Sequence, residues 1–486
     1  MTETLKEKTA KGLFWGGMNN GVLQLVGALV AIILGRLLST HDYGMLAIIS
    51  VYSLIATALQ ESGFKIALAN IQHPTDKDYN SVFWFNIIVG CSAYAILFFC
   101  APLIAQFYPD EDAASIVQLC RYAFLSIIIA SFGTAQGTFL YKNLMAKQQA
   151  KASIAAVMIS NAIGITMAFL GCGYWSLASQ GLTYVFVNTS LLWYYSPWRP
   201  HFEIDFAPVR RMFRFSCKIL ATTITMHINN NVLNLLLGRY FGTSNAGIYN
   251  QAYQWDFKCF SLVQNMVNQV AQPVLVDLKN DGERQLNALR KLMRFTAFIS
   301  FPLLFGFGLV AKEFIVITIG AKWLASAELV RILCIAGATM PLSTLLSNMI
   351  LSKGRSGTYF LCTLALCVVQ IATMLLIYPL GIRTMVVAYV VINVIWLFVW
   401  YFFTHRLTGY RAVWFIKDTA PFALAALGVM ALIHLVTASV EALWLLFIVR
   451  IVMAVLLYYA VMRIARVQIL AECMQFVMAK INKNRK

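Results

Sequence analysis

Long apolar runs, separated by short polar segments, occupy nearly the whole chain. A helix needs about 20 mainly apolar residues to cross the hydrocarbon core of a bilayer, and each run reaches that length. Lipid cannot satisfy the polar groups of an open backbone, so such runs cross it as helices. The pattern predicts an all-α integral membrane protein with about fourteen transmembrane helices, at residues 13–38, 44–68, 80–107, 113–139, 151–171, 174–195, 212–238, 245–272, 294–317, 325–351, 358–379, 382–403, 416–437 and 442–463.

The segments between the runs leave no room for a soluble domain. The longest, 196–211 and 276–293, have the length of an amphipathic connector. Composition agrees, because 60% of the 486 residues are hydrophobic and 12% are charged, with a mean hydropathy of +0.71. Soluble proteins have roughly 45–50% apolar and about 25% charged residues. The composition therefore excludes a soluble protein.

No motif predicts an enzyme, a cofactor or a bound metal. The chain contains no H-E-x-x-H, P-loop or G-x-S-x-G sequence, the motifs of zinc proteases, nucleotide-binding proteins and hydrolases. Glu203-Ile-Asp205 resembles a D-x-D metal motif, but it stands in a short basic loop with no nucleotide-binding domain around it. The ten cysteines include no C-x-x-C pair. A membrane-embedded polymerase or glycosyltransferase is disfavoured further, because no sizeable external loop is present.

Alternate connecting segments carry most of the positive charge. With the N-terminus placed in the cytoplasm, the cytoplasmic segments hold more than two thirds of the 38 Lys and Arg residues, as the positive-inside rule requires. The opposite segments are poor in cations, and one of them, residues 109–112, reads Pro-Asp-Glu-Asp. Both termini are therefore predicted to be cytoplasmic. The net charge of +18 is mainly an orientation signal, and no nucleic-acid partner is predicted.

One short motif occurs twice. Residues 34–44, LGRLLSTHDYG, recur at 237–247 as LGRYFGTSNAG, with five of eleven positions identical and no gap. The copies end the first and the seventh predicted spans, so the two halves enter the membrane the same way round. Transporters built from such parallel repeats place the substrate path at the repeat interface. Arg36 and Arg239 occupy the same position in both copies, where each can line a shared mouth or snorkel to the interface.

Polar and charged side chains recur on the first two predicted spans of each half. A charge near the bilayer centre costs about 2.5–3.5 kcal/mol on insertion scales, so such residues usually face a cavity or a partner. The repeat offset pairs Gln24 of the first span with His227 of the seventh. We predict a hydrated, partly cationic cavity between the halves, with substrate-binding candidates Lys65, Lys258, Arg36, Arg239, Asn19, Asn20, Gln24, His227, Asn230 and Lys218.

Two acidic residues, Asp256 and Glu61, accompany these cations. Asp256 lies two residues from Lys258 near the middle of the eighth span, and Glu61 stands one helical turn before Lys65. Each set can form a structural ion pair, and each can instead line the cavity. In the second case Asp256 and Glu61 are candidates for coupling transport to H⁺, Na⁺ or the membrane potential, which is worth about 2.3 kcal/mol per charge per 100 mV.

Several motifs follow one another in a fixed order over nearly the whole chain. They occupy residues 34–44, 61–63, 71–72, 80–86, 171–178, 198–200, 237–247, 301–302, 320–323, 331–333 and 354–356. In order and spacing the chain resembles the polysaccharide flippases of the Wzx and WzxC type, in the multidrug/oligosaccharidyl-lipid/polysaccharide (MOP) exporter superfamily. The resemblance implies a MATE/MOP-like fold of two parallel-repeat, six-helix lobes, at 1–196 and 212–405, joined by a cytoplasmic linker at 197–211. Two accessory spans and a basic tail, at 406–486, follow, and the two spans are expected to serve a lipid tail.

The same resemblance implies transport of a lipid-linked surface-polysaccharide unit, such as an O-antigen or lipopolysaccharide repeat. The oligosaccharide would ride on undecaprenyl pyrophosphate and move from the cytoplasmic to the periplasmic leaflet of a bacterial inner membrane by alternating access. Expected partners are this substrate, membrane lipids and other polysaccharide assembly proteins. Cations suit a pyrophosphate, and Asn and Gln suit sugars.

Two other transport functions stay open at this point. An ion-coupled multidrug antiporter of the same superfamily would favour an aromatic, acidic cavity over a cationic one. A flippase for the peptidoglycan lipid precursor would use the same chemistry as the polysaccharide flippase.

Overall fold

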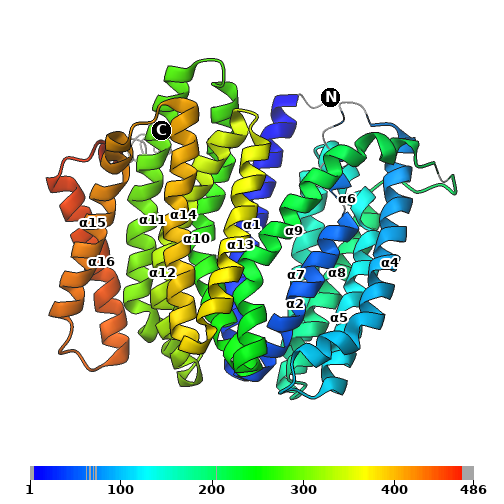
Figure 1. The fold of residues 1–486 in the computed structure, drawn as a ribbon, viewed down its shortest axis with the longest axis horizontal. Coiled ribbons are helices and arrows are strands. Elements are labelled where there is room, and N and C mark those ends of the chain that lie inside the picture. Colours follow the sequence, from blue (N-terminus) through cyan, green and yellow to red (C-terminus); the bar gives the residue numbers. More distant parts are fainter. Residues whose placement is uncertain are drawn as a thin grey trace, which may run out of the picture. The chain divides into compact units, whose positions relative to one another are not determined.

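A computed structural model describes residues 5–472, except 62, 65–66, 69–70, 72–73 and 204, with backbone alone described for 5–19, 214–215 and 218. All regular structure in this described part is helical (Figure 1). The helices up to the middle of the chain are α1 (Leu5–Leu37), α2 (Thr40–Glu61), α4 (Asp76–Phe107), α5 (Ala113–Ser131), α6 (Thr134–Lys142), α7 (Ala146–Phe169), α8 (Tyr174–Tyr195), α9 (Ala207–Phe241) and α10 (Thr243–Asp277). They are followed by α11 (Gly282–Thr318), α12 (Leu324–Ser352), α13 (Ser356–Ile377), α14 (Ile382–Thr408), α15 (Ala412–Val436) and α16 (Leu443–Ile464), with short 3₁₀ turns at Ala321–Trp323 and Tyr378–Leu380.

Each of the fourteen predicted apolar runs overlaps a helix of the described residues, and the fourth overlaps two; the second run, predicted to end at residue 68, overlaps α2, which ends at Glu61. Among the described residues, eleven helices are long and apolar enough to cross a membrane. The protein is an all-helical, multi-span membrane protein. The long helices α8, α9 and α10 are not among those eleven. Of these, α9 and α10 carry the polar residues that the sequence singled out.

The fourth predicted span, 113–139, is broken in the structure. α5 ends at Ser131 and α6 begins at Thr134, and the sequence across the break reads Ser-Phe-Gly-Thr. The break frees backbone carbonyls, which must be satisfied inside a membrane. The indole of Trp193 donates to the carbonyl of Phe132 at 2.8 Å, and the amide of Gln60 donates to Thr134 Oγ1 at 3.0 Å. Side chains of α8 and α2 therefore stabilise the break.

The backbone contacts divide the chain into two compact units, residues 1–250 and 251–486. In unit 1, α2 packs on α4, α5 and α9, while α1 packs on α7. The predicted linker is anchored to the start of α4, because Asn80 Nδ2 donates to the carbonyl of Glu203 at 2.6 Å and Trp84 Nε1 to that of His201 at 2.8 Å. The boundary between the units falls inside α10, since α9 packs against helices of the first unit. The predicted lobe boundaries stay a prediction.

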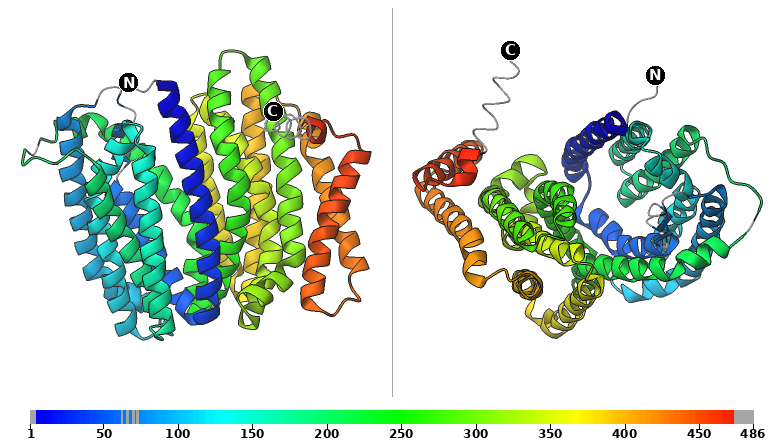
Figure 2. Two further views of the ribbon diagram at one scale, coloured as in Figure 1. Left: turned by 180° about the vertical axis from the view of Figure 1, so that it is seen from behind. Right: turned by 90° about the horizontal axis from the view of Figure 1, so that it is seen from above.

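Unit 2 is built around α11, α12 and α14, with α15 and α16 packed on α11 (Figure 2). α12 is its central helix and contains Pro341, which cannot donate a backbone hydrogen bond. The hydroxyl of Ser300 in α11 donates to the carbonyl of Ala338, one turn before the proline, at 2.8 Å. α11 begins at Gly282 rather than at the predicted residue 294, because the amphipathic connector continues the helix, and the Asp281 side chain caps its first turn.

A polar cluster joins the start of α15 to α11. The Asp418 side chain is 2% exposed and receives hydrogen bonds from Arg290 Nε and the Tyr410 hydroxyl, both at 2.9 Å, with Arg294 Nε at 3.5 Å. Tyr410 lies in the connection between α14 and α15, where burial and the Asp418 carboxylate raise its pKa above the usual range. It therefore stays protonated and donates.

Replacing Asp418 with asparagine is expected to lower the free energy of unfolding by about 2 kcal/mol, because hydrogen bonds between charged groups contribute about 1.5–3 kcal/mol and the arginines are partly screened by solvent. Thermal unfolding in detergent measures the effect. Lys417→Gln, at the exposed neighbouring position, is the control. Equal stability of both variants would contradict the structural role of the cluster.

Candidate functional site

A row of polar side chains follows α9 in unit 1. His227 is half-buried and Asn230 is exposed. Asn231 Nδ2 donates to the carbonyl of His227 at 2.9 Å, and Asn234 Nδ2 lies 3.5 Å from Asn231 Oδ1. The carboxylate of Glu61 in α2 is within electrostatic range of His227, so the structure brings these two predicted residues together. Sequence reasoning missed Asn231, although its spacing of four residues from His227 marks the same face of a helix.

Three predicted substrate-binding residues, Asn19, Asn20 and Gln24, lie on α1. Asn20 is exposed and Gln24 is half-buried, while the side chain of Asn19 lies outside the described residues. α1 packs mainly on α7, and α9 packs on α2 and α4. The repeat-based pairing of Gln24 with His227 therefore stays a prediction.

The basic candidates of unit 1 differ in their surroundings. Arg36 is exposed, whereas Arg239 is half-buried, donates to the carbonyl of Phe107 at 2.6 Å and lies 5.1 Å from that ring. Arg239 thus binds the end of α4. Lys65 lies outside the described residues, as does the side chain of Lys218.

Asp256 and Lys258 lie on different faces of α10 in unit 2. Residues two apart on a helix point about 200° apart. Lys258 is half-buried with its Nζ 5.2 Å from the ring of Trp255, and no ion pair joins it to Asp256 or to any other acid that the structure describes. Asp256 is 3% exposed. The structure thus separates the two charges that stand close in sequence.

The carboxylate of Asp256 faces α12 and α14. A Cβ atom added at Gly337 of α12 would lie 2.4 Å from Asp256 Oδ1, so a glycine leaves the space that the carboxylate occupies. Cys334 of α12, Tyr253 of α10 and Tyr389 of α14 lie within electrostatic range of the carboxylate. No cation of the described residues pairs with it. Buried charges are normally paired, so this carboxylate is suited to receive a proton or a monovalent cation.

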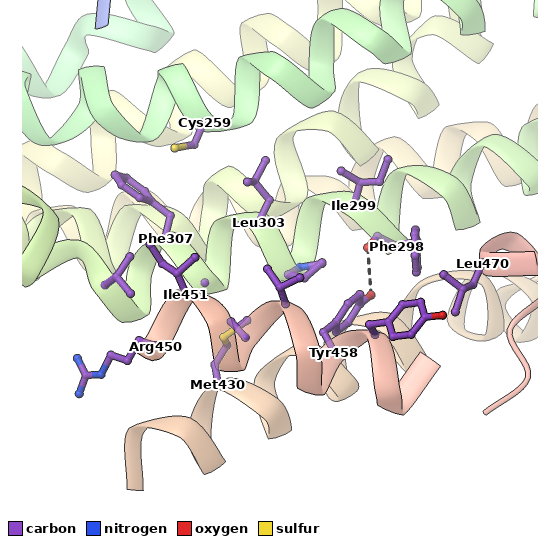
Figure 3. A pocket seen from close by; sticks show the side chains of 16 residues that line it. Cys259, Phe298, Ile299, Leu303, Phe307, Met430, Arg450, Ile451, Tyr458 and Leu470 are labelled. Atoms are coloured by element: carbon purple, nitrogen blue, oxygen red, sulfur yellow. Dashed lines mark hydrogen bonds between the residues drawn. The ribbon is translucent and has the colours of Figure 1, made fainter. Parts of the chain in front are cut away.

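An apolar cavity of about 520 Å³ lies between α11, α15 and α16 (Figure 3). Phe298, Leu303 and Phe307 of α11 line one side, and Ile451 and Tyr458 of α16 line another. The Tyr458 hydroxyl donates to the carbonyl of Phe298 at 3.0 Å, which holds α16 to α11. The cavity suits a hydrocarbon chain, because nearly all of its lining side chains are apolar.

Arg450 stands at this cavity and is buried, 5% exposed. Its Nη1 donates to Glu313 Oε1 at 2.8 Å, its Nε to Thr437 Oγ1 at 3.0 Å, and its Nη2 lies 3.4 Å from His434 Nδ1. Sequence reasoning missed Glu313, because the two partners are far apart along the chain.

The sequence profile of the polysaccharide biosynthesis protein family matches residues 33–328. The chain belongs to this family. The predicted resemblance to Wzx-type proteins is thereby confirmed, and the family is one of polysaccharide biosynthesis transporters.

Relatives of this family member are named for the biosynthesis of different polymers. The chain is similar to the teichuronic acid biosynthesis protein TuaB of Bacillus subtilis (strain 168), at 25% identity over 365 residues, 74% of each chain. It is similar to the lipopolysaccharide biosynthesis protein WzxC of Escherichia coli (strain K12), at 23% identity over 358 residues, 72% of this chain and 71% of WzxC. It is also similar to the succinoglycan biosynthesis transport protein ExoT of Rhizobium meliloti (strain 1021), at 26% identity over 347 residues, 71% of this chain and 69% of ExoT.

Solved structures share the fold of this family member. The lipid II flippase MurJ in an inward closed conformation superposes with a TM-score of 0.74 at 14% identity, covering 94% of this chain and all of MurJ. An inward-facing multidrug resistance transporter of the MATE family gives a TM-score of 0.65 at 14% identity, covering 79% of this chain and 94% of that one. The predicted MATE/MOP-like fold class is confirmed.

Proposed function

We propose that the protein is a flippase for an undecaprenyl-pyrophosphate-linked oligosaccharide, the repeat unit of a surface polysaccharide. It moves the unit from the cytoplasmic to the periplasmic leaflet of a bacterial inner membrane by alternating access, with both termini in the cytoplasm. Membership of a polysaccharide biosynthesis family and the fold shared with a lipid-linked-precursor flippase support this proposal.

The observation that carries the proposal is the lysine of α10. Lys258 is half-buried on a predicted span and lacks an ion-pair partner within the described part of the chain. Such a cation is costly in a membrane unless an anion neutralises it. A pyrophosphate headgroup supplies that anion and forms charge-assisted hydrogen bonds with an ammonium group. A drug-binding cavity for cationic compounds would gain nothing from this lysine.

The sugars and the lipid tail need different surroundings. The amide side chains of Asn230 and Asn231 on α9, which are exposed and half-buried respectively, offer donors and acceptors for sugar hydroxyls. The cavity beside α15 and α16 offers an apolar surface for the polyprenyl chain, which can stay in contact with lipid. Asp256 takes the coupling proton or Na⁺ in this scheme. Glu61, near His227, is the corresponding candidate in unit 1.

Lys258→Gln is expected to lower surface-polysaccharide display at least about tenfold, because a charge-assisted hydrogen bond of about 1.5–3 kcal/mol is lost from the transported state. Display is measured on cells that lack the gene and carry each variant at equal protein level. Lys258→Arg should retain most of the display, and Lys312→Gln, which removes an exposed cation of the same unit, is the matched control.

Three outcomes would contradict the assignment. Wild-type display from Lys258→Gln would exclude the lysine as a headgroup ligand. If the gene deletion leaves the polysaccharide unchanged and makes the cells drug-sensitive, the substrate is a drug. If the deletion leaves the polysaccharide unchanged and the cells lyse, the substrate is the peptidoglycan precursor.

A further inference from the structure

The two copies of the repeated motif contact each other within unit 1. A Cβ atom added at Gly44 would lie 1.9 Å from the carbonyl oxygen of Thr243, and one added at Gly247 would lie 1.9 Å from that of Thr40. Thr40 and Gly44 hold the same motif positions as Thr243 and Gly247. The first turns of α2 and α10 therefore cross reciprocally, each glycine lying on the threonine of the other copy. We call this contact the glycine crossing. It leaves no room for any side chain, because real Cβ atoms do not approach so closely.

A second contact holds the same end of the unit. Glu111 lies in the turn between α4 and α5, and its Oε2 is 2.8 Å from His41 Nε2. The Thr243 hydroxyl donates to Glu111 Oε1. One carboxylate thus binds a residue of each motif copy. The neighbouring Asp112 accepts from the backbone and hydroxyl of Ser115, which hold its pKa below the usual range and fix the turn that presents Glu111.

Further contacts gather four turns at this end (Figure 1, lower end of the blue-to-green helices). The ring of His41 lies 6.4 Å from that of Tyr174, at the start of α8. A Cβ atom added at Gly238 would lie 2.4 Å from Ile48 of α2. The turns that precede α2, α5, α8 and α10 therefore converge. The proposed orientation places these four turns at the periplasmic surface.

We propose that this end is the periplasmic gate of the transporter. In the closed gate the glycine crossing packs the start of α2 against the start of α10, and the Glu111 carboxylate links His41 to Thr243. The inference rests on the proposed alternating-access function, in which the contacts that close this end must break before a substrate leaves on this side. Opening breaks two side-chain contacts of one carboxylate and lifts two glycines from two carbonyls. These contacts are all non-covalent, so the motif copies can part and re-form them.

The test measures opening directly. Ala246 is 0% exposed and lies beside Gly247, so Ala246→Cys reports whether the crossing is open. The cysteine is labelled with a maleimide in lipid nanodiscs, where both faces meet the reagent, and the product at position 246 is quantified by peptide mass spectrometry. Adding Glu111→Gln should raise the labelling rate about tenfold, as expected for loss of a charge-assisted hydrogen bond. Asp110→Asn, which removes a charge from the same exposed turn, should leave the rate unchanged.

Glycine variants test the glycine crossing separately. Gly44→Ala should raise the labelling rate at position 246, because its methyl group prevents the crossing from closing. Gly27→Ala, at a helical glycine with no atom within 4 Å of the added Cβ, should not. If Gly44→Ala fails to fold, Glu111→Gln decides alone. Unchanged labelling in Glu111→Gln would overturn the gate and leave the transport proposal intact, since the display assay of Lys258→Gln is independent of it. Reduced display in Lys258→Gln with wild-type labelling at position 246 is the result expected if both proposals hold.

Discussion

Replacing Arg450 with methionine should lower the free energy of unfolding by about 3–5 kcal/mol, because it leaves the Glu313 carboxylate buried without its counter-charge. Both side chains are nearly inaccessible, with Arg450 5% and Glu313 3% exposed. The guanidinium also binds Thr437 and the carbonyl of Leu309. The variant therefore loses the contacts that join α16 to α11 and to the end of α15. Thermal unfolding in detergent, followed by tryptophan fluorescence, measures the loss.

The double variant Arg450→Met/Glu313→Leu is the decisive companion. Exchanging a whole buried ion pair for apolar residues is often neutral, so the double variant should recover most of the lost stability. Arg383→Met, at an exposed position of the same unit, controls for the loss of an arginine. A double variant as unstable as the single one would show that packing, and not the unpaired carboxylate, causes the effect.

Replacing Asp256 with asparagine should uncouple transport from its ion gradient. The amide has nearly the same shape, so it fits the space that Gly337 leaves, but it cannot exchange a proton or hold a cation as a carboxylate does. In proteoliposomes the wild-type protein should move a fluorescent lipid-linked oligosaccharide faster under an imposed H⁺ or Na⁺ gradient. The variant should move it at one rate with and without the gradient, having lost a drive of about 2.3 kcal/mol per charge per 100 mV.

Asp277→Asn, at the exposed end of the same helix, is the control and should respond to the gradient as the wild type does. Asp256→Glu should also be impaired, because the longer side chain has no space beside Gly337. An Asp256→Asn variant that still accelerates under the gradient would remove Asp256 from the coupling role.

Hydrophobic patterning predicted the helices because each span must be apolar over a bilayer's thickness. It did not find the break after Ser131, because the stabilising groups, Trp193 and Gln60, come from other helices. It also began α11 too late, because an amphipathic segment gives no apolar run even when it continues a helix. A hydrophobic pattern indicates which segments lie in the lipid, whereas helix breaks and helix extensions depend on contacts with neighbouring helices.

The sequence predicted the types of residue in the candidate site better than it predicted which of them contact one another. Asp256 and Lys258 are close in sequence, yet the turn of the helix places them on different faces. Arg450 and Glu313 are 137 residues apart, so only the fold shows that they pair. The repeat identified Gly44 and Gly247 as corresponding positions. It did not show that the two copies contact each other, because a sequence repeat carries no information on which surfaces meet.

The glycine crossing has a consequence for how a duplicated gene can change. After duplication, two copies diverge freely wherever each meets different neighbours. Here each copy is the neighbour of the other, so a larger residue in either one would damage a surface common to both. Mutation in one half alone cannot improve such a contact, and only paired changes could. The threonine and the glycine shared by the two motif copies are therefore expected to change only together.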